Sequence, residues 1–462
     1  MTGEATRAAS PWKPCDIRGV FPCAVSEKLF RHVGAALGSE IEEGGRVVVG
    51  GDFRLSTPPL KSALIEGLTA SGLHVLDCGQ APTPLVYFKG QETHAQAVFV
   101  VTASHNPPDQ NGLKWMIGAL PPEPADIDRL RAAVQAGAAR NGHGSVEIVD
   151  PLACYETWML SRWTGLISPS RKIVLDAGNG AWSRLGPAIF RQLGFEAECL
   201  FCETDGRFPN RSPDCARSGN LSALRAAVVE RKAALGIAWD GDGDRVAFVD
   251  EGGTHATTDE ISILLARAVL KNGVAGEPVV CDIKLSDAVR REILRAGGRP
   301  MLERSGHAFM RRRLLSERAV LGLDACGHYF FREAGSRDDG LYSALFLLKL
   351  LEGRSLADLR RSVGPLFSTP ELRLPAALLS HDAVLRRLRA AFPGAEESNI
   401  DGARLVVDDG IVLARESSTE AVVSLRIEGL SSAGYGRLVR HCLDSLAEAR
   451  ALLRHQIDEA GQ

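Results

Sequence analysis

The chain has 462 residues, and its 54 lysines and arginines nearly balance 57 aspartates and glutamates, which leaves a formal net charge of -3 at pH 7. Hydrophobic residues make up 45% and charged residues 24%, the composition of a globular protein. At roughly 100 to 200 residues per domain, this length predicts three or four domains. The balanced charge gives no reason to expect nucleic acid or an anionic membrane as a partner.

Targeting signals and cysteine usage indicate the compartment. Residues 1–11 lack the apolar segment of a signal peptide and no stretch approaches about 18 consecutive apolar residues, so we expect a cytoplasmic protein that does not enter a membrane. Ten scattered cysteines predict reduced thiols. Cys199 and Cys202 form one Cys-x-x-Cys pair, but no second pair follows, so we expect core thiols rather than zinc ligands.

Strands, loops and helices are predicted to alternate along most of the chain. The apolar period predicts a helix over residues 26–38, followed by a short buried strand over 46–50. Similar strand, loop and helix units are predicted over 172–193 and 278–296. Their spacing favours three similar α/β domains with mixed or parallel sheets. After a proline-containing linker at 365–370, the pattern changes to a smaller α+β unit.

The first polar loop of chemical interest follows an apolar segment, Val98–Val101. It has the sequence Thr-Ala-Ser-His-Asn-Pro-Pro, with Ser104 at its tip, Asn106 able to hold a turn and Pro107 barring a helix. A strand that delivers one hydroxyl into a loop can present a nucleophile. Serine and asparagine are also ordinary turn residues, so the loop alone fits a plain turn as well.

A second polar loop, Asp-Gly-Asp-Gly-Asp-Arg, again follows a buried strand pattern. Its three carboxylates, on Asp240, Asp242 and Asp244, occupy alternate positions and can turn to one side as oxygen ligands for Mg²⁺. An EF-hand is excluded because Arg245 stands where the sharp turn needs glycine, and because the next residues predict a strand.

These two loops resemble, in this order, the phosphoserine loop and the metal loop of the α-D-phosphohexomutases, the phosphomannomutase/phosphoglucomutase superfamily. The resemblance runs nearly end to end. It implies three related α/β domains with mixed sheets and a smaller α+β C-terminal domain around a central cleft. It also implies that Ser104 carries a phosphoryl group and that Mg²⁺ binds the three aspartates and a phosphate oxygen on that serine. The expected domains are 1–150 (phosphoserine loop), 151–252 (metal), 253–367 (sugar recognition) and 368–462 (distal phosphate).

The same resemblance implies catalytic roles for three more residues. Arg18, in an Asp-Ile-Arg-Gly segment, matches an active-site arginine of the family. Lys114, ten residues after Ser104, matches a lysine that is a general acid/base candidate, and His307 matches a histidine near the catalytic centre. Taken alone, such an arginine and lysine are more typical of the solvent-exposed surface, and a lone histidine is more typical of a structural role.

The family's sugar-specificity loop, usually Gly-Glu-x-Ser-Gly-His, is altered in this chain. Leu323 stands at the first glycine, Asp324 replaces the glutamate and Cys326 replaces the serine, while His328 matches the family histidine. Because aspartate is shorter and a thiol bonds weakly, these changes affect the groups that would bind sugar hydroxyls. The resemblance further implies that Arg245 and Lys284 contact the substrate.

An arginine with three hydroxyl residues lies between two predicted strands near the C-terminus. Such a group can bind phosphate, and a plain hairpin explains it equally well. The family places its distal phosphate-binding loop at the matching positions, Arg415, Ser417, Ser418 and Thr419.

The expected reaction is reversible phosphoryl transfer between the 1- and 6-positions of hexose phosphates, of mannose, glucose or both. It proceeds through a phosphoserine and a hexose 1,6-bisphosphate intermediate, which is also the expected activator. We expect a phosphosugar as the partner, no nucleic acid or membrane, and a monomer or weak dimer. The altered sugar loop leaves a hexose 1,6-bisphosphate synthase or a phosphoglucosamine mutase on the same fold as alternatives. A non-catalytic phosphosugar-binding protein is the third possibility.

Overall fold

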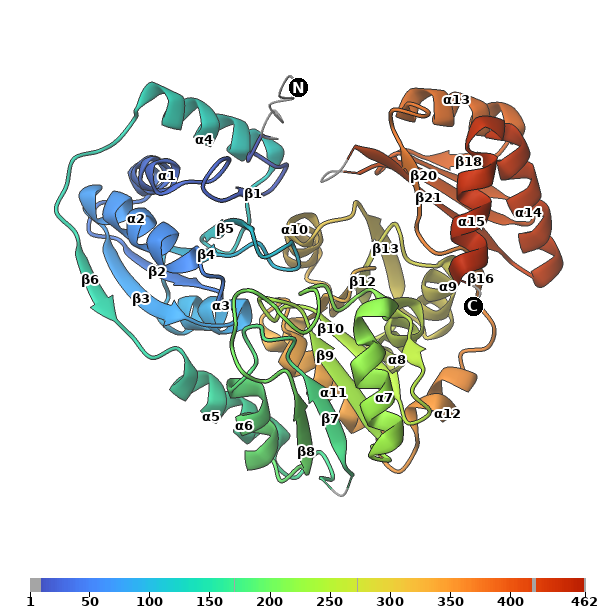
Figure 1. Ribbon diagram of the computed structural model, residues 1–462, viewed down its shortest axis with the longest axis horizontal. Coiled ribbons are helices and arrows are strands. Elements are labelled where there is room, and N and C mark those ends of the chain that lie inside the picture. The colour runs from blue at the N-terminus through green and yellow to red at the C-terminus, as the bar shows by residue number, and fades with distance from the viewer. Residues whose placement is uncertain (1–9, 170, 272, 418–420, 461–462) are drawn as a thin grey trace, which may run out of the picture. The chain divides into compact units, whose positions relative to one another are not determined.

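The computed structural model describes residues 10–169, 171–271, 273–417 and 421–460. The chain forms two compact units, and each is built from two separate stretches: Met1–Thr257 with Cys326–Arg360, and Thr258–Ala325 with Arg361–Gln462 (Figure 1). A search of the described helices finds none that is long and apolar enough to span a membrane.

The first sheet of the first unit has the strand order β1-β5-β4-β2-β3-β6. Its strands are β1 (Ile17–Val20), β2 (Arg46–Gly51), β3 (His74–Gln80), β4 (Ala97–Val101), β5 (Gln110–Ile117) and β6 (Ser145–Ile148). Its helices are α1 (Glu27–Glu40), α2 (Thr57–Ala70), α3 (Thr83–Glu92) and α4 (Pro124–Ala136). β2 runs parallel to β3 and β4, whereas β5 is antiparallel to β4 and β1. Because β5 runs antiparallel to β4, Lys114 pairs with Val100, which lies near the end of β4 that leads into the serine loop.

The second sheet of this unit, β11-β10-β9-β7-β8, is also mixed. Its strands are β7 (Ile173–Asp176), β8 (Ala197–Leu200), β9 (Leu235–Trp239), β10 (Val246–Asp250) and β11 (His255–Ala256). The helices of this region are α5 (Leu152–Trp163), α6 (Leu185–Gln192), η1 (Ser218–Leu221) and α7 (Ser222–Glu230). The antiparallel strands β9 and β10 flank the Asp240–Arg245 loop, which confirms the exclusion of an EF-hand.

Residues Cys326–Arg360 return to the first unit and complete its core. They form β15 (Tyr329–Phe331), η2 (Arg332–Ala334), α11 (Gly340–Leu351) and α12 (Leu356–Arg361). Nearly every residue of α11 is buried. Just before α11, the Arg337 guanidinium lies 4.9 Å from the ring centre of Phe88 and 5.0 Å from that of Trp158. The Tyr155 hydroxyl donates to Asp339 at 2.9 Å.

The second unit has two parts. The first is a parallel arrangement β13-β12-β14 with three helices. These elements are α8 (Thr258–Leu270), β12 (Pro278–Asp282), α9 (Asp287–Arg295), β13 (Arg299–Glu303), α10 (His307–Glu317) and β14 (Leu321–Leu323). The second is the antiparallel sheet β16-β21-β20-β19-β18, with β17 also paired to β21.

Three helices pack on this antiparallel part (Figure 1). Its strands are β16 (Phe367–Ser368), β17 (Leu372–Pro375), β18 (Glu396–Ser398), β19 (Ala403–Val407), β20 (Gly410–Glu416) and β21 (Val422–Gly429). Its helices are α13 (His381–Ala391), α14 (Ser432–Ser445), η3 (Ala447–Ala449) and α15 (Arg450–Ala460). The α/β parts and this smaller α+β part confirm the predicted fold class, while the four domain ranges stay a prediction.

Local predictions were confirmed with small shifts and two corrections. The helix predicted over 26–38 is α1, and Ser26 caps it by accepting a hydrogen bond from the Leu29 N–H. The strand before the phosphate loop continues to Glu416, because it pairs with β21 through residues that were predicted as loop. The prediction of core thiols was wrong for Cys199, which is exposed because β8 is an edge strand.

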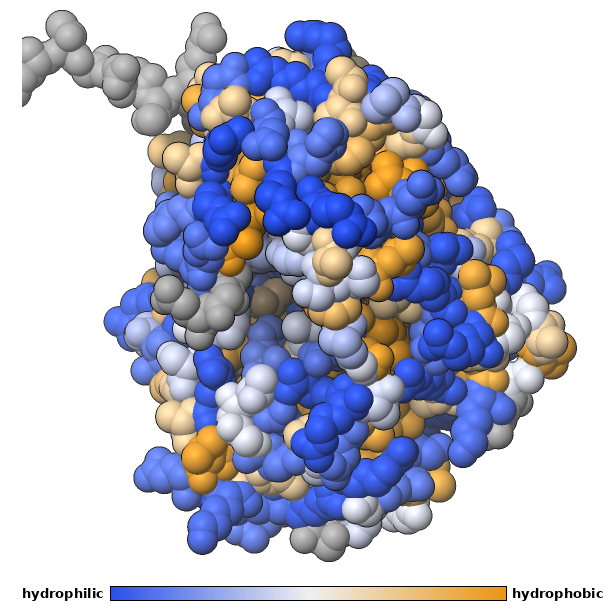
Figure 2. Space-filling view, turned by 90° about the vertical axis from the view of Figure 1, so that its right-hand side faces the viewer, coloured by the Kyte–Doolittle hydropathy of each residue, from blue (hydrophilic) through white to orange (hydrophobic). Residues whose placement is uncertain are grey.

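The surface mixes charged and apolar residues. Figure 2 shows one face of the molecule, on which hydrophilic residues predominate and apolar residues lie between them in small groups. This distribution agrees with the ordinary share of charged residues, 24% of the chain.

Candidate active site

The predicted nucleophile lies in the loop between β4 and β5. Ser104 has a left-handed φ of 52° and no exposed surface. A non-glycine residue keeps this conformation only when its surroundings fix it. The Ser104 N–H donates to Thr102 Oγ1 at 2.8 Å, and its Oγ donates to Asp240 Oδ2 at 2.8 Å. The structure thus brings the predicted serine and the metal loop into direct contact.

Arg54, which sequence reasoning missed, holds this loop by hydrogen bonds. Its guanidinium is fully buried, and Nε donates to Asp52 Oδ2 at 3.0 Å. The remaining N–H groups donate at 2.6 to 3.0 Å to four carbonyl oxygens, those of Ser104, Asn106, Pro107 and Gln110. Asp52 also accepts from Thr102 Oγ1 at 2.7 Å. The only signal in the sequence is an Asp-x-Arg segment directly after a predicted buried strand.

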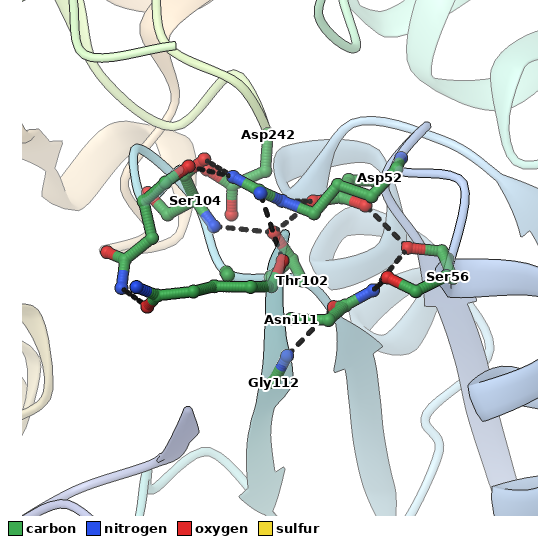
Figure 3. Close-up of polar contacts among 12 residues, drawn as sticks. Asp52, Ser56, Thr102, Ser104, Asn111, Gly112 and Asp242 are labelled. Carbon is green, nitrogen blue, oxygen red and sulfur yellow. Dashed lines mark hydrogen bonds and ion pairs between the residues drawn. The ribbon is translucent and has the colours of Figure 1, made fainter. Parts of the chain in front are cut away.

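A second set of bonds in Figure 3 fixes the start of β5. Asn111 Nδ2 donates to Ser56 Oγ at 2.9 Å and to Thr57 Oγ1 at 3.0 Å. Its Oδ1 accepts from the Gly112 N–H at 2.8 Å. Both ends of the serine loop are therefore held by buried polar contacts.

Arg18 meets the same loop, as the resemblance implied. Its Nη1 donates to the Ala103 carbonyl at 3.3 Å and to Asn106 Oδ1 at 3.1 Å. Nε is held by Asp16 Oδ2 at 2.8 Å. The loop thus contacts a buried cation that is itself oriented by a carboxylate.

The three predicted metal ligands lie together and are buried. Carboxylate oxygens of Asp240, Asp242 and Asp244 lie within 4.8 Å of one another. Asp242 Oδ1 is buried and accepts no hydrogen bond from the residues that the structure describes. The metal loop approaches Ser104 closely, since a Cβ at Gly241 would lie 2.5 Å from the carbonyl oxygen of Ser104. Three hard oxygen donors and an unsatisfied carboxylate oxygen fit a divalent cation.

Lys114 neutralises part of this acidic cluster. Its Nζ lies 2.8 Å from Asp242 Oδ2 and 2.5 Å from Asp244 Oδ2. Burial alone would lower the pKa of Lys114, but these two carboxylates outweigh burial and raise it. Burial, together with the neighbouring carboxylates, raises the pKa of Asp240 to about 8. Lys114 is therefore a buried ammonium held by two carboxylates, and the acidic surroundings of Asp240 favour its protonated form.

Residues of the altered sugar loop lie beside Arg245. Arg245 Nε donates to His328 Nε2 at 3.2 Å, and His328 Nε2 lies 3.3 Å from Asp244 Oδ1. Burial would lower the pKa of Arg245, but the nearby thiol of Cys326 and the carboxylate of Asp240 outweigh burial and raise it. Arg245, His328 and Cys326 thus adjoin the metal loop.

His105 is a second residue that the sequence analysis missed. His105 is half-buried. Its removal from water, followed by the neighbouring groups of Arg245, Arg18, Lys114 and His328, lowers its pKa well below the usual range. Its Nδ1 has no hydrogen-bond partner among the described residues. His105 is therefore a neutral imidazole that binds a proton weakly. Its position directly after Ser104 was the available signal.

The second unit contains the other predicted site residues that the structure describes: Lys284, His307, Asp324, Arg415 and Ser417. Burial raises the pKa of Asp282 to about 6, with Lys284 opposing the shift and Asp324 adding to it. Lys284 Nζ lies 3.9 Å from Glu371 Oε2. Ser418 and Thr419 lie outside the described residues.

Comparison with family models matches three parts of the chain. Residues 13–141, 163–253 and 257–366 match the models described as phosphoglucomutase/phosphomannomutase, alpha/beta/alpha domains I, II and III.

Individual proteins resemble the chain over nearly its whole length. The phosphomannomutase/phosphoglucomutase of Pseudomonas aeruginosa is 34% identical over 430 residues, which cover 92% of each chain. A phosphoglucomutase of Neisseria gonorrhoeae is 34% identical and covers 92% of this chain and 94% of its own. A crystal structure of a phosphoglucomutase/phosphomannomutase family protein from Burkholderia thailandensis matches 95% of this chain and 97% of its own, with a TM-score of 0.87 and 34% identity.

Proposed function

This chain belongs to the phosphoglucomutase/phosphomannomutase family, and we propose that it interconverts the 1- and 6-phosphates of glucose and mannose with Ser104 as the phosphoryl carrier. The observation that supports this role best is the buried contact of Ser104 Oγ with Asp240 at 2.8 Å. A serine held against a carboxylate cluster and surrounded by buried cations suits phosphoryl transfer, in which positioning and electrostatics supply most of the rate.

In the first transfer, a free hydroxyl of the hexose phosphate bonds to the phosphorus on Ser104, and the bond between that phosphorus and Ser104 Oγ breaks. The proton of the hydroxyl passes to a general base of the site. Lys114, as an ammonium, gives a proton to the departing serine oxygen. The hexose 1,6-bisphosphate then turns over and returns its other phosphoryl group by the reverse steps.

The remaining residues bind the substrate in this proposal. Arg18 and His307 bind the reacting phosphoryl group. The sugar is bound by Arg245, Lys284, Asp324, Cys326 and His328. The phosphate that does not react is bound by Arg415, Ser417, Ser418 and Thr419. Because the substrate binds in two orientations, this second phosphate site serves both halves of the reaction.

We further propose Mg²⁺ as the cation of the aspartate cluster and hexose 1,6-bisphosphate as the activator that first phosphorylates Ser104. Asp240, Asp242 and Asp244 would hold the ion together with a phosphate oxygen on that serine. When bound, Mg²⁺ neutralises charge on the transferring phosphoryl group. A cytoplasmic location is proposed because the ten cysteines are scattered along the chain without the dense spacing of a disulfide framework.

Magnesium affinity should rise with pH up to about 8, because the cation must displace the proton that Asp240 holds with a pKa of about 8. Below that value the increase should approach about tenfold per pH unit. Titration calorimetry with MgCl₂ at constant ionic strength measures it. Asp240→Asn, as the control, should bind Mg²⁺ more weakly and without this slope. An affinity that is flat between about pH 6 and 8 would contradict the assignment of Asp240 as a ligand.

Turnover tests the proposed function directly. Glucose 1-phosphate and mannose 1-phosphate are each mixed with Mg²⁺ and a catalytic amount of the matching bisphosphate, and phosphorus NMR follows the products. We expect both to become 6-phosphates. If neither sugar is converted, the mutase is refuted. The replacement of the family glutamate and serine by Asp324 and Cys326 favours, as a second candidate, a hexose 1,6-bisphosphate synthase, which accumulation of bisphosphate would support.

A further inference from the structure

The C-terminal sheet brings an unexpected carboxylate to Arg415. Asp401 lies in the turn between β18 and β19, followed by Gly402 with a φ of 75°. A Cβ at Gly402 would lie 2.2 Å from the Ala414 carbonyl oxygen and 2.7 Å from the Arg415 Cα. Glycine therefore allows this turn to lie directly against β20, and it places the preceding aspartate beside the arginine.

One oxygen of Asp401 joins two parts of the second unit. Asp401 Oδ2 accepts from Arg415 Nε at 2.8 Å and from the Ser305 N–H at 3.2 Å. Ser305 is itself held by Asp282, whose Oδ2 accepts from Ser305 Oγ at 2.8 Å. Since His307 begins α10 two residues later, the carboxylate ties Arg415 to the loop that leads to this histidine.

The pair is shielded from water, which strengthens it. The Arg415 side chain is 8% exposed and that of Asp401 is 19% exposed. A guanidinium is planar and its five N–H groups have fixed directions, so a carboxylate on Nε sets the direction of the other four. An arginine oriented in this way is prepared to meet a phosphate without first losing side-chain freedom.

We propose that Asp401 is a positioning residue. It fixes Arg415 to the loop before His307 and so prepares the Arg415 guanidinium to bind the phosphate group of the substrate that is not being transferred. This inference rests on the proposed function, because the phosphate is that of the proposed substrate. The same contact also permits the opposite role, in which the Asp401 carboxylate competes with the phosphate for Arg415. The two roles predict opposite effects when the carboxylate is removed.

The test compares Asp401→Ala, Asp401→Asn and Glu416→Ala. Both accepted bonds reach one oxygen, so asparagine can keep them without the charge, whereas alanine removes them. Glu416 is exposed and follows Arg415 in β20, so its alanine variant removes an equal charge near the same arginine. KM and kcat for glucose 1-phosphate, and calorimetric binding of glucose 6-phosphate, are measured for each.

We expect Asp401→Ala to raise KM and weaken binding on the order of tenfold, with kcat falling less, because the lost bond orients a group that binds ground state and transition state alike. Asp401→Asn and Glu416→Ala should stay within about threefold of the wild type. Unchanged or tighter binding in Asp401→Ala overturns the inference, as does an equal loss in Glu416→Ala.

Hydrogen exchange at the Ser305 amide separates this inference from the proposed function. Asp401→Ala should exchange this amide faster than the wild type and Glu416→Ala, whatever the activity. If the wild-type protein neither binds nor converts hexose phosphates, the proposed function fails. Faster exchange would then still support the anchoring of Arg415 to this loop, and unchanged exchange would overturn it.

Discussion

Ser104→Ala should lower kcat/KM for hexose 1-phosphate conversion by about four orders of magnitude or more, since loss of a nucleophile removes the covalent route altogether. The substitution deletes the oxygen that donates to Asp240 at 2.8 Å and that would carry the phosphoryl group. Steady-state turnover in the presence of Mg²⁺ and glucose 1,6-bisphosphate measures the loss. Mass spectrometry of the peptide around residue 104 should show phosphorylation in the wild type only.

The matched control is Ser380→Ala. Ser380 is an exposed serine that caps α13 in the second unit, so its loss should cost about 1 kcal/mol of stability and leave turnover intact. Circular dichroism of both variants checks that they fold. Turnover of Ser104→Ala at the wild-type rate would exclude a phosphoserine mechanism for this chain.

Arg54→Lys should destabilise the first unit by about 3 kcal/mol or more, although the charge is kept. The five N–H groups of Arg54 all find acceptors, while a lysine ammonium has three donors on a single atom. At least two buried acceptors would lose their partner, at about 1 to 3 kcal/mol each. The midpoint of thermal unfolding by calorimetry, in buffer without substrate, measures the effect.

Arg207→Lys provides the comparison for this experiment. Arg207 pairs with Asp205 at 2.6 Å, but its side chain is 73% exposed. An exposed pair of this kind contributes little, so Arg207→Lys should leave the midpoint of thermal unfolding nearly unchanged. If Arg54→Lys were equally mild, the serine loop would be held mainly by its other contacts, among them the Thr102 hydroxyl.

The sequence was informative where a motif is continuous along the chain. The three aspartates and Ser104 each follow the end of a buried strand, but these strands, β9 and β4, lie in two different sheets. Their contact at 2.8 Å was anticipated through the resemblance, which implies Mg²⁺ on the three aspartates and on a phosphate oxygen of that serine. Lys114 was singled out only by the resemblance, and the structure gives the reason for its place: β5 turns back beside β4 and pairs Lys114 with Val100.

Other site residues depend on partners that are distant in the sequence. Arg54 binds carbonyl oxygens about fifty residues away, and a carbonyl has no sequence signature. Asp401 lies in an unremarkable turn until β19 and β20 pair and bring it to Arg415. The exposure of Cys199 follows from β8 being an edge strand, which is decided only when the whole sheet forms.

The interrupted course of the chain through the first unit affects its synthesis. This unit ends at residue 257 but is completed only by 326–360, which supply Arg337, Asp339 and the buried helix α11. The ribosome must therefore add roughly a hundred residues, about 5 to 20 s of translation, before the aromatic residues of α5 receive these partners. During that interval Tyr155 lacks the carboxylate of Asp339 and Trp158 lacks the guanidinium of Arg337, so the first unit cannot complete its core in N- to C-terminal order until its last segment emerges.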